Sequence, residues 1–263
     1  MRTVHTLIDL SGRKALLAGG AGHIGRACAE ALLELGAAVA ILDRDPEACR
    51  TRAAELGPNA SPLPCDLADE AATRAAVREA VSALGGLDIL VHCAGFVGAT
   101  GGPGWAVPFE QQSVTAWDAG LRVNLTSAFV MAQQALDVLA SSGHGSIILI
   151  SSIYGMVGPD MNLYTGIPMA NPFGYGVSKG GLLQLMRYLA TVLAPRIRVN
   201  AISPGGIWRG QPELFRQRYE ARTPINRMAV EEDLKGAVAY LASDLSTYVT
   251  GHNLVVDGGW TAW

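Results

Sequence analysis

The chain has 263 residues, of which 49% are hydrophobic and 16% charged, and this balance predicts a soluble globular protein with a substantial core. The net charge of −3, with no block of basic residues, argues against nucleic acid or an anionic membrane surface as a partner. No segment approaches the length of a membrane span, and the apolar run near the N-terminus is too short for a signal peptide, so we expect a cytoplasmic protein.

Short apolar runs alternate with helical patterns along the chain. The first helix is expected to end at Gly36, a residue typical of helix C-caps. The second is expected to begin with Asp45 as N-cap and Pro46 at its first position. In chain order we expect a strand over 13–20, a helix over 26–36, a strand over 37–43, a helix over 45–57, a strand over 63–67, a helix over 69–85, a strand over 87–95, a helix over 115–140, a strand over 146–152, a helix after Pro172, a strand over 197–203, a helix over 231–243 and a strand over 253–259.

Most of these strands are continuous apolar runs, which is typical of a parallel sheet covered by helices on both faces. We therefore predict an α/β fold, a single Rossmann-type doubly wound domain over residues 1–263 with about seven strands. Its glycine-rich cofactor half covers roughly 10–125, and its catalytic and substrate half roughly 126–263. The Gly/Pro-rich stretch 96–108 lies between a strand and a helix and is interpreted as an active-site rim.

The spacing of the cysteines bears on whether the chain has a metal site or disulfides. They lie far apart and form no Cys-x-x-Cys pair, at Cys28, Cys49, Cys65 and Cys93. This spacing argues against a zinc site and against a disulfide framework. We expect free thiols and no metal.

The turn after the first strand carries a phosphate-binding pattern. Gly20, Gly22 and Gly25 form G-x-G-x-x-G, and such glycines allow the backbone to approach a pyrophosphate at a helix N-terminus. Asp43 follows at the end of the second strand, where a carboxylate binds the adenosine ribose hydroxyls and repels a 2′-phosphate. This predicts NAD as cofactor, with NADP less favoured. The neighbouring Arg44 keeps the alternative open, because a guanidinium there could tolerate the phosphate.

Tyr175 and Lys179 lie four residues apart and share one helical face. Taken alone, such a pair is most often an ordinary surface feature. With the glycine turn and further motifs, however, the chain resembles the short-chain dehydrogenase/reductase family over nearly its whole length. The matching motifs are residues 18–25, Asp66-Leu67, "HCAG" at 92–95, Asn124 in "RVNL", Ser152, the Tyr175/Lys179 pair and "SPGGI" at 203–207. The chain departs from the family at His23, at His92 and Cys93, and after the Pro-Gly, where Arg209 and Gly210 stand near the usual threonine position.

The resemblance implies a catalytic set of Asn124, Ser152, Tyr175 and Lys179. A phenol with a pKa of about 10 is a weak base at neutral pH, but the Lys179 ammonium and an oxidised nicotinamide would stabilise its anion. By the resemblance, Lys179 also holds the nicotinamide ribose, Ser152 hydrogen-bonds the substrate oxygen, and Asn124 anchors a water in a proton relay. The expected cofactor-binding residues are Gly19, Gly22, His23, Ile24, Gly25, Asp43, Arg44, Asp66, Leu67, His92, Cys93, Ala94, Gly95, Tyr175, Lys179, Pro204, Gly205, Gly206 and Ile207.

The substrate prediction depends on two segments. Residues 153–174 join two catalytic residues and carry a polar and aromatic mixture suited to hydroxyl-rich ligands, with Asn162, Tyr164, Thr165 and Asn171, although a surface loop or a subunit contact is the alternative. This segment and the ending "VVDGGWTAW" resemble the subgroup of polysaccharide and flagellin-glycan biosynthesis oxidoreductases. Residues 206–224 are expected to form a mobile lid, in which Trp208, Arg209 and Arg216 could meet an acidic group. Arginines on a solvated helix are the commoner explanation. The predicted substrate contacts are Asn162, Tyr164, Trp208 and Arg209.

These features predict an NAD-dependent oxidoreductase that interconverts a secondary alcohol and a ketone on a sugar, sugar acid or polyol. An NADP(H)-linked 3-oxoacyl-type reductase is the alternative, disfavoured by Asp43, and a non-catalytic dinucleotide-binding regulator is a third possibility. By its resemblance to the family, the chain is expected to form a homo-oligomer, a tetramer assembled through the helices that contain Asn124 and Tyr175.

Overall fold

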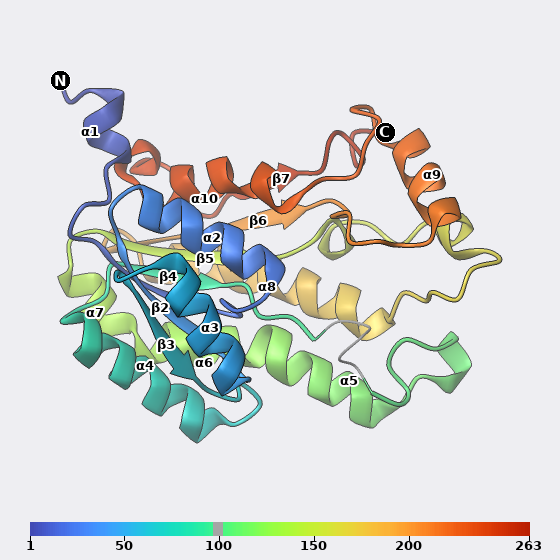
Figure 1. The fold of residues 1–263 in the computed structure, drawn as a ribbon, viewed down its shortest axis with the longest axis horizontal. Coiled ribbons are helices and arrows are strands. Elements are labelled where there is room, and N and C mark those ends of the chain that lie inside the picture. The colour runs from blue at the N-terminus through green and yellow to red at the C-terminus, as the bar shows by residue number, and fades with distance from the viewer. Residues whose placement is uncertain (97–101) are drawn as a thin grey trace.

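In residues 1–96 and 102–263, which the computed structural model describes, seven parallel strands form one central sheet (Figure 1). Their order across the sheet is β3-β2-β1-β4-β5-β6-β7. The strands are β1 (Lys14–Ala18), β2 (Ala38–Asp43), β3 (Ala60–Pro64), β4 (Ile89–His92), β5 (Gly145–Ile150), β6 (Ile197–Pro204) and β7 (Asn253–Val256). This topology confirms the predicted doubly wound α/β fold.

Helices cover both faces of the sheet. One buried core joins the sheet to α4, α6 and α8, and a second joins it to α2 and α10. The α-helices are α1 (Val4–Ile8), α2 (His23–Glu34), α3 (Pro46–Leu56), α4 (Glu70–Leu84), α5 (Val114–Leu121), α6 (Ser127–Gln134), α7 (Leu136–Ser141), α8 (Phe173–Val192), α9 (Glu213–Arg222) and α10 (Lys235–Ala242). Because both faces are buried, the strands can be continuous apolar runs. Within the described ranges, no helix combines the length and apolar character needed to cross a membrane.

Three elements differ from their predicted positions. Strand β3 covers 60–64 rather than 63–67, and two of its five residues are prolines, which an edge strand tolerates. The helix expected over 115–140 is divided into α5, a π-helical turn over Arg122–Thr126, α6 and α7. The segment expected as a lid contains the helix α9, and α1 was not predicted. The predicted rim at 96–108 lies in part outside the described residues.

The sheet order fixes where a site can form. β1 is flanked by β2 on one side and β4 on the other, so the chain changes direction there, and β1 and β4 end side by side at Ala18 and His92. In doubly wound sheets, ligands bind beyond the carboxyl ends of the strands at this switch point. The segments that leave β1, β4, β5 and β6 all start from this edge.

Candidate active site

The glycine turn between β1 and α2 packs against the chain that follows β4. Gly19 has φ +76°, and a Cβ there would lie 2.6 Å from the Cα of Ala94. A Cβ on Gly25 would collide with the carbonyl of Gly19. Helix α2 begins at His23 with Gly22 as N-cap, so its first N–H groups have no intrahelical partner. This arrangement suits a phosphate.

Asp43 ends β2 and reaches back to the glycine turn. One of its carboxylate oxygens accepts a hydrogen bond from Ala21 N at 3.2 Å, and the other accepts one from Arg44 N at 2.8 Å. The side chain therefore lies where the ribose of a dinucleotide bound at this turn would be recognised. Sequence reasoning missed Arg52 of α3, whose Nη2 donates to Ala21 O at 3.3 Å. Its guanidinium is a second cation beside Arg44 at this end of the site.

Two predicted cofactor contacts have buried side chains. The Leu67 side chain is packed into the core, and the turn around it is fixed by a hydrogen bond from Ala68 N to the exposed Asp66 carboxylate. His92 is fully buried, and its Nε2 lies 2.7 Å from Ser127 Oγ.

The Ser127 hydroxyl donates to a carbonyl of its own helix turn, so His92 Nε2 is the donor to Ser127. Burial, together with the nearby Lys179 charge, lowers the pKa of His92 to about 3, so the imidazole is neutral. The His92 side chain packs between β4 and α6 and is fully buried, so a cofactor contact of His92 would involve its backbone, and this contact stays a prediction.

Ser152, Tyr175 and Lys179 come together beyond β5. Lys179 Nζ donates to Ile150 O at 2.8 Å and lies 5.6 Å from the centre of the Tyr175 ring. The Ser152 hydroxyl lies beside the Tyr175 phenol and acts to lower its pKa. The neighbouring Ser151 instead donates to Lys179 O at 2.8 Å, which anchors α8 to the end of β5. The structure thus brings Ser152 rather than Ser151 to the tyrosine.

Burial shifts both titratable groups of this set toward their neutral forms. It lowers the pKa of Lys179 to about 8. It also raises the pKa of the Tyr175 phenol, against which the neighbouring Ser152 hydroxyl acts in the opposite direction. A protonated phenol can give a proton, and further positive charge entering the site would favour the phenolate, which can take one.

Asn124 lies in the π-helical turn, fully buried. Its Oδ1 accepts a hydrogen bond from Phe96 N, and its Nδ2 donates to Ser178 Oγ at 2.9 Å. Ser178 Oγ donates in turn to Tyr175 O at 2.7 Å. Asn124 therefore connects the chain after β4 to the helix turn that carries Tyr175. The sequence gives no sign of the π turn, although such turns are frequent at functional sites.

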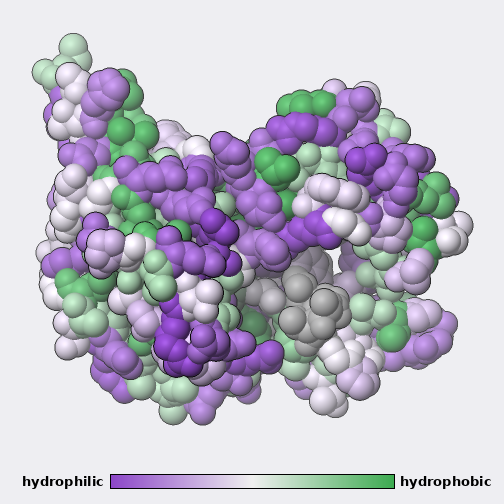
Figure 2. Space-filling view, viewed as in Figure 1, coloured by the Kyte–Doolittle hydropathy of each residue, from purple (hydrophilic) through white to green (hydrophobic). Residues whose placement is uncertain are grey.

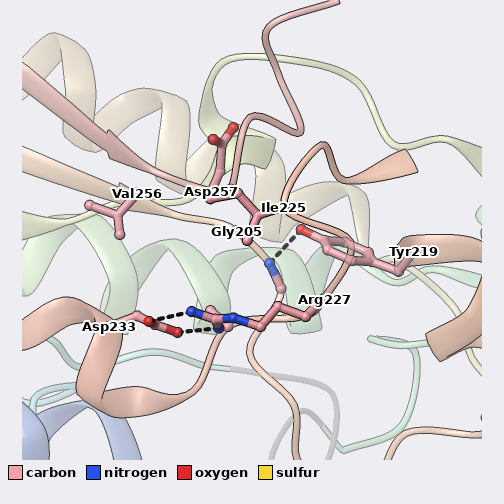
Figure 3. A pocket seen from close by; sticks show the side chains of 10 residues that line it. Gly205, Tyr219, Ile225, Arg227, Asp233, Val256 and Asp257 are labelled. Atoms are coloured by element: carbon pink, nitrogen blue, oxygen red, sulfur yellow. Dashed lines mark hydrogen bonds and ion pairs between the residues drawn. The ribbon is translucent and has the colours of Figure 1, made fainter. Parts of the chain in front are cut away.

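The Pro-Gly-Gly segment after β6 forms one wall of a cavity of about 140 Å³ (Figure 3). Gly206 N donates to the Tyr219 hydroxyl, and a double ion pair between Arg227 and Asp233 closes the opposite side. The cavity is lined by Gly205, Gly206, Tyr219, Ile225, Arg227, Ala229, Asp233, Val256, Asp257 and Gly258. Among the described residues, none of the proposed catalytic set lines it. Pro204 and Ile207 are buried on either side of the two glycines.

Part of the 153–174 segment faces the catalytic side. The Tyr154 and Tyr164 hydroxyls are 2.9 Å apart, and Asn171 Nδ2 donates to Tyr164 at 3.1 Å. Tyr154 follows Ser152 by two residues and its N–H donates to Ser152 Oγ at 3.2 Å, so this network adjoins the proposed catalytic serine. The network therefore places two hydroxyl groups and one amide group, which can bond to polar ligands, among aromatic rings.

Asn162 does not belong to this network. Its side chain is exposed in a separate cleft of about 760 Å³, lined by Asp160, Asn162, Leu163, Thr165, Arg218, Ala221, Arg222 and Trp263. Arg218 Nη1 donates to Thr165 O at 2.6 Å and to Asn162 O at 3.0 Å, which fixes the backbone of this turn. Within the described ranges, this cleft includes none of the four proposed catalytic residues, so the structure separates Asn162 from Tyr164.

The expected lid is an ordered helix with a packed apolar side. Phe215 and Tyr219 of α9 are buried in an aromatic cluster with Trp260, and the Tyr219 and Trp260 rings stack with centres 5.9 Å apart. Between α9 and α5 the surface is hollowed (Figure 2). Trp208 lies under the Arg216 guanidinium at 5.2 Å. The mobility of this segment stays a prediction.

Arg209 pairs with an acidic residue of the same chain. Its Nε lies 3.0 Å from a carboxylate oxygen of Glu231, and His23 Nδ1 lies 3.9 Å from the same oxygen. The positive charge of Arg209 also lowers the pKa of Tyr175 and of Cys93. The predicted substrate residue therefore stands between the N-terminus of α2 and the catalytic set.

Comparisons with known proteins agree with this geometry. Residues 19–261 match the family model described as enoyl-(acyl carrier protein) reductase. The chain is 36% identical to cis-4-hydroxycyclohexanecarboxylate dehydrogenase of Sinomonas cyclohexanicum, over 95% of this chain and 97% of that protein. It is 34% identical to L-rhamnose 1-dehydrogenase (NAD(P)(+)) of Sphingomonas sp. (strain SKA58), over 95% and 96%.

Solved structures show the same relationship. A gluconate 5-dehydrogenase from Burkholderia cenocepacia J2315, in complex with NADP and tartrate, superposes with a TM-score of 0.87 at 30% identity, covering 99% of this chain and all of that one. The similarity spans the glycine turn, the sheet and the segment with the tyrosine and lysine. The chain therefore belongs to the short-chain dehydrogenase/reductase family.

Proposed function

We propose that the protein is an NAD-dependent oxidoreductase that interconverts a secondary alcohol and a ketone, with Tyr175 as the acid/base. The observation that carries the proposal is the placement of the phenol between the Ser152 hydroxyl and the Lys179 ammonium. Family membership supports a nucleotide-dependent oxidoreductase that acts on alcohol groups. In a non-catalytic regulator, this buried arrangement of a tyrosine, a lysine and a serine would serve no purpose.

In the oxidative direction, Tyr175 takes the proton of the substrate hydroxyl while Ser152 holds the same oxygen by a hydrogen bond. Lys179 stabilises the phenolate by its charge and remains fixed by its bond to Ile150 O. Asn124 keeps the Tyr175 turn of α8 in place through Ser178 and is proposed to anchor the relay water. A nicotinamide held at the glycine turn would supply the hydride acceptor in this direction and the hydride donor in the other. The proton leaves or returns through the tyrosine.

The proposed preference for NAD depends on Asp43, whose carboxylate is held against the glycine turn. A 2′-phosphate placed there would meet this negative charge, although Arg44 and Arg52 lie close by. We expect kcat/KM to favour NAD over NADP at least about tenfold, which corresponds to roughly 1.4 kcal/mol.

The measurement is kcat/KM with each cofactor for the wild type and for Asp43→Ala, with Asp45→Ala, a helix cap outside the site, as the matched control. Equal use of both cofactors by the wild type would refute the argument and make the arginines phosphate ligands.

The proposed substrate is a sugar, sugar acid or polyol, or the matching ketone. The Tyr154, Tyr164 and Asn171 network supports it, because a buried substrate hydroxyl left without a partner costs about 1–3 kcal/mol. The names of the relatives, which include a hydroxycyclohexanecarboxylate, a rhamnose and a gluconate dehydrogenase, agree with an oxygen-rich substrate. The narrower resemblance to glycan-biosynthesis enzymes remains part of this proposal.

A parallel screen tests the substrate class. Purified protein is assayed with keto sugars, aldonates, polyols, cyclic hydroxy acids, simple secondary alcohols and a 3-oxoacyl thioester, each with both cofactors. We expect the hydroxylated compounds to exceed the thioester. Turnover of the thioester alone would establish the alternative, a 3-oxoacyl-type reductase, which the 31% identity with the 3-oxoacyl-[acyl-carrier-protein] reductase of Aquifex aeolicus supports.

We also propose a cytoplasmic homotetramer. Apolar side chains on α6 and α8 are exposed in the single chain, with Phe129 at 44%, Phe173 at 56% and Tyr188 at 61%. Exposed large apolar groups on neighbouring helices are consistent with a subunit contact. Light scattering coupled to gel filtration gives the mass in solution, and a monomer would contradict this proposal.

A further inference from the structure

Trp105 lies at the point where the chain after β4 meets α5 and α8. Its side chain is buried, and its ring meets the Phe96 ring edge-on with centres 5.0 Å apart. Phe96 N is the donor to Asn124 Oδ1 in the π turn. The indole therefore packs against the segment that Asn124 holds, although the sequence did not single out Trp105 as a site residue.

Two helical glycines leave the space that the indole fills. A Cβ at Gly120 of α5 would lie 2.5 Å from both Cζ3 and Cη2 of Trp105. A Cβ at Gly174 of α8 would lie 3.0 Å and 3.4 Å from the same two atoms. Because alanine suits a helix better than glycine, the two glycines agree with a steric requirement rather than with helix formation. The benzo edge of the indole is thus fixed between α5 and α8.

The backbone at Trp105 is anchored to the start of α5. Gly104 has φ +79°, and its carbonyl accepts a hydrogen bond from Ser113 N at 3.0 Å. Ser113 is the N-cap of α5, and its hydroxyl accepts a hydrogen bond from Ala116 N. Within the described ranges, Trp105 Nε1 has no hydrogen-bond partner, so Trp105→Phe breaks no hydrogen bond that these residues make. This substitution therefore tests the shape of the side chain.

Gly174 immediately precedes Tyr175, so the indole packs against the helical turn that carries the phenol. One turn later, Lys179 is tied to the sheet, because its Nζ donates to Ile150 O at the end of β5 at 2.8 Å. The sheet thus positions the lysine, whereas the turn with the tyrosine packs on Trp105. Because the interior is close-packed, a displacement of the indole moves the phenol relative to the ammonium.

We propose that Trp105 is a positioning residue for Tyr175, and that its indole transmits the position of α5 to the phenol. The effect on turnover depends on the proposed function, because it assumes that Tyr175 is the acid/base. The placement of the phenol does not depend on turnover, since it rests on the packing of the indole against the two glycines.

The test adds a methyl group at Gly120, because the three atoms nearest to a Cβ there all belong to the Trp105 ring. A change at Gly174 would alter the tyrosine turn directly and is therefore not used. Gly120→Ala is made in the wild type and in the Trp105→Phe background, where the ring is shorter. The matched control is Gly236→Ala on α10, another helical glycine, whose Cβ would have no atom within 4 Å.

Fluorine NMR and kinetics follow the phenol separately. Protein labelled with meta-fluorotyrosine gives a Tyr175 resonance, identified by its absence in Tyr175→Phe, which reports the surroundings of the ring without turnover. The kcat is measured with the compound that gives the highest turnover in the substrate screen, and the NAD dissociation constant by calorimetry.

We expect Gly120→Ala to shift the Tyr175 resonance and to lower kcat at least about tenfold, because a small misplacement of a reacting group costs much of the rate. NAD affinity should change little. In the Trp105→Phe background, the same methyl group should cause a much smaller shift and a much smaller loss of kcat. Gly236→Ala should behave like the wild type.

A wild-type resonance and kcat in Gly120→Ala would overturn the proposal. Equal losses in the two backgrounds would do the same, since the effect would then not pass through the indole. If Gly120→Ala does not fold, Trp105→Phe alone decides, and an unchanged Tyr175 resonance there would refute the positioning role. Failure of the proposed function is recognised separately. If the resonance shifts as expected but no compound is turned over, Trp105 retains its role in placing the phenol, while the catalytic role of Tyr175 is refuted.

Discussion

The Tyr175 phenol lies beside the Lys179 ammonium. Replacing each group in turn separates an effect on turnover from an effect on NAD affinity. Tyr175→Phe keeps the ring but removes the hydroxyl, so we expect turnover to fall on the order of a hundredfold or more while NAD affinity changes little. Lys179→Met should reduce both, since its ammonium is proposed to contact cofactor and phenol. Steady-state kinetics and NAD titration distinguish them. Tyr248→Phe, at an exposed position outside the site, is the control, and near-normal turnover of Tyr175→Phe would place the base elsewhere.

The neutral, buried His92 makes the folded protein sensitive to acid. Its pKa of about 3 lies below the ordinary value of 6.5, so the unfolded chain binds a proton in this interval that the folded chain does not. The stability contribution is therefore present above pH 6.5 and is lost as the pH falls toward 3. We expect the free energy of unfolding to fall by up to about 1.4 kcal/mol per pH unit from this group.

Urea denaturation at pH 7 and pH 5 measures this effect. His92→Gln keeps an amide donor but cannot titrate, so its difference between the two pH values should be smaller than that of the wild type. The exposed His144 provides the control substitution His144→Gln, which should leave the wild-type difference unchanged. An equal pH dependence in His92→Gln would show that other groups are responsible.

Residues whose role follows from local sequence could be predicted well. Asp45 caps α3 through hydrogen bonds from Glu47 N and Ala48 N, as its position before Pro46 indicates. Arg52 could not be predicted, because its contact with Ala21 joins a helix to a turn that lies 31 residues earlier. The burial of the His92 side chain could not be predicted either, because the sequence shows that His92 ends a strand, but not which face it occupies.

At the level of elements, the hydrophobic period predicted most strands and helices but missed breaks within them. The π turn over Arg122–Thr126 inserts one residue into a helical pattern and itself contains neither glycine nor proline, and Ser127 N donates to Arg122 O across it. Helix α9 carries many charged residues, and its buried Phe215 and Tyr219 lie only four residues apart, so its apolar face is short. Such elements depend on tertiary contacts that a local pattern does not contain.

Asn124 lies within the π turn and bonds to the backbone of Phe96 and to the side chain of Ser178. Asn124→Ala leaves Phe96 N and the Ser178 hydroxyl without this partner, so we expect a loss of about 1–3 kcal/mol in the free energy of unfolding and reduced turnover. Denaturation curves and kcat measure the two effects. Ser141→Ala, a surface hydroxyl on α7 that bonds only within its own helix, is the control. Unchanged stability of Asn124→Ala would remove Asn124 from its proposed positioning role.

For the whole molecule, the sheet order explains why the cofactor side could be predicted and the substrate side could not. The glycine turn, Asp43 and the catalytic helix follow from motifs next to predicted strands. The substrate side is formed by contacts between 153–174, α9 and the C-terminal residues, such as Tyr164 against Phe215 at 5.5 Å. Asn162 lines the exposed cleft, whereas the Tyr164 hydroxyl, two residues later, bonds to Tyr154 and Asn171, a separation that sequence spacing alone does not show.

A bound dinucleotide should stabilise the entire fold, because the glycine turn contacts both β4 and β2. At a concentration of about 100 times Kd, NAD adds roughly 2.7 kcal/mol to the free energy of unfolding. Thermal unfolding with NAD, NADP or AMP measures how much each nucleotide stabilises the fold. We expect NAD to give the largest increase in Tm. A larger increase with NADP would contradict the role assigned to Asp43.

The stack around Trp260 makes the substrate side optically observable. Trp260 lies against Tyr219, edge-on to Tyr154, and under the Arg222 guanidinium at 4.5 Å. Arg222 is paired with Asp160 of the substrate segment at 2.8 Å. A displacement of that segment moves a cation relative to the indole and so alters its fluorescence emission. The difference between the spectra of the wild type and of Trp260→Phe isolates the emission of this indole. It would therefore record substrate entry in real time without any attached dye.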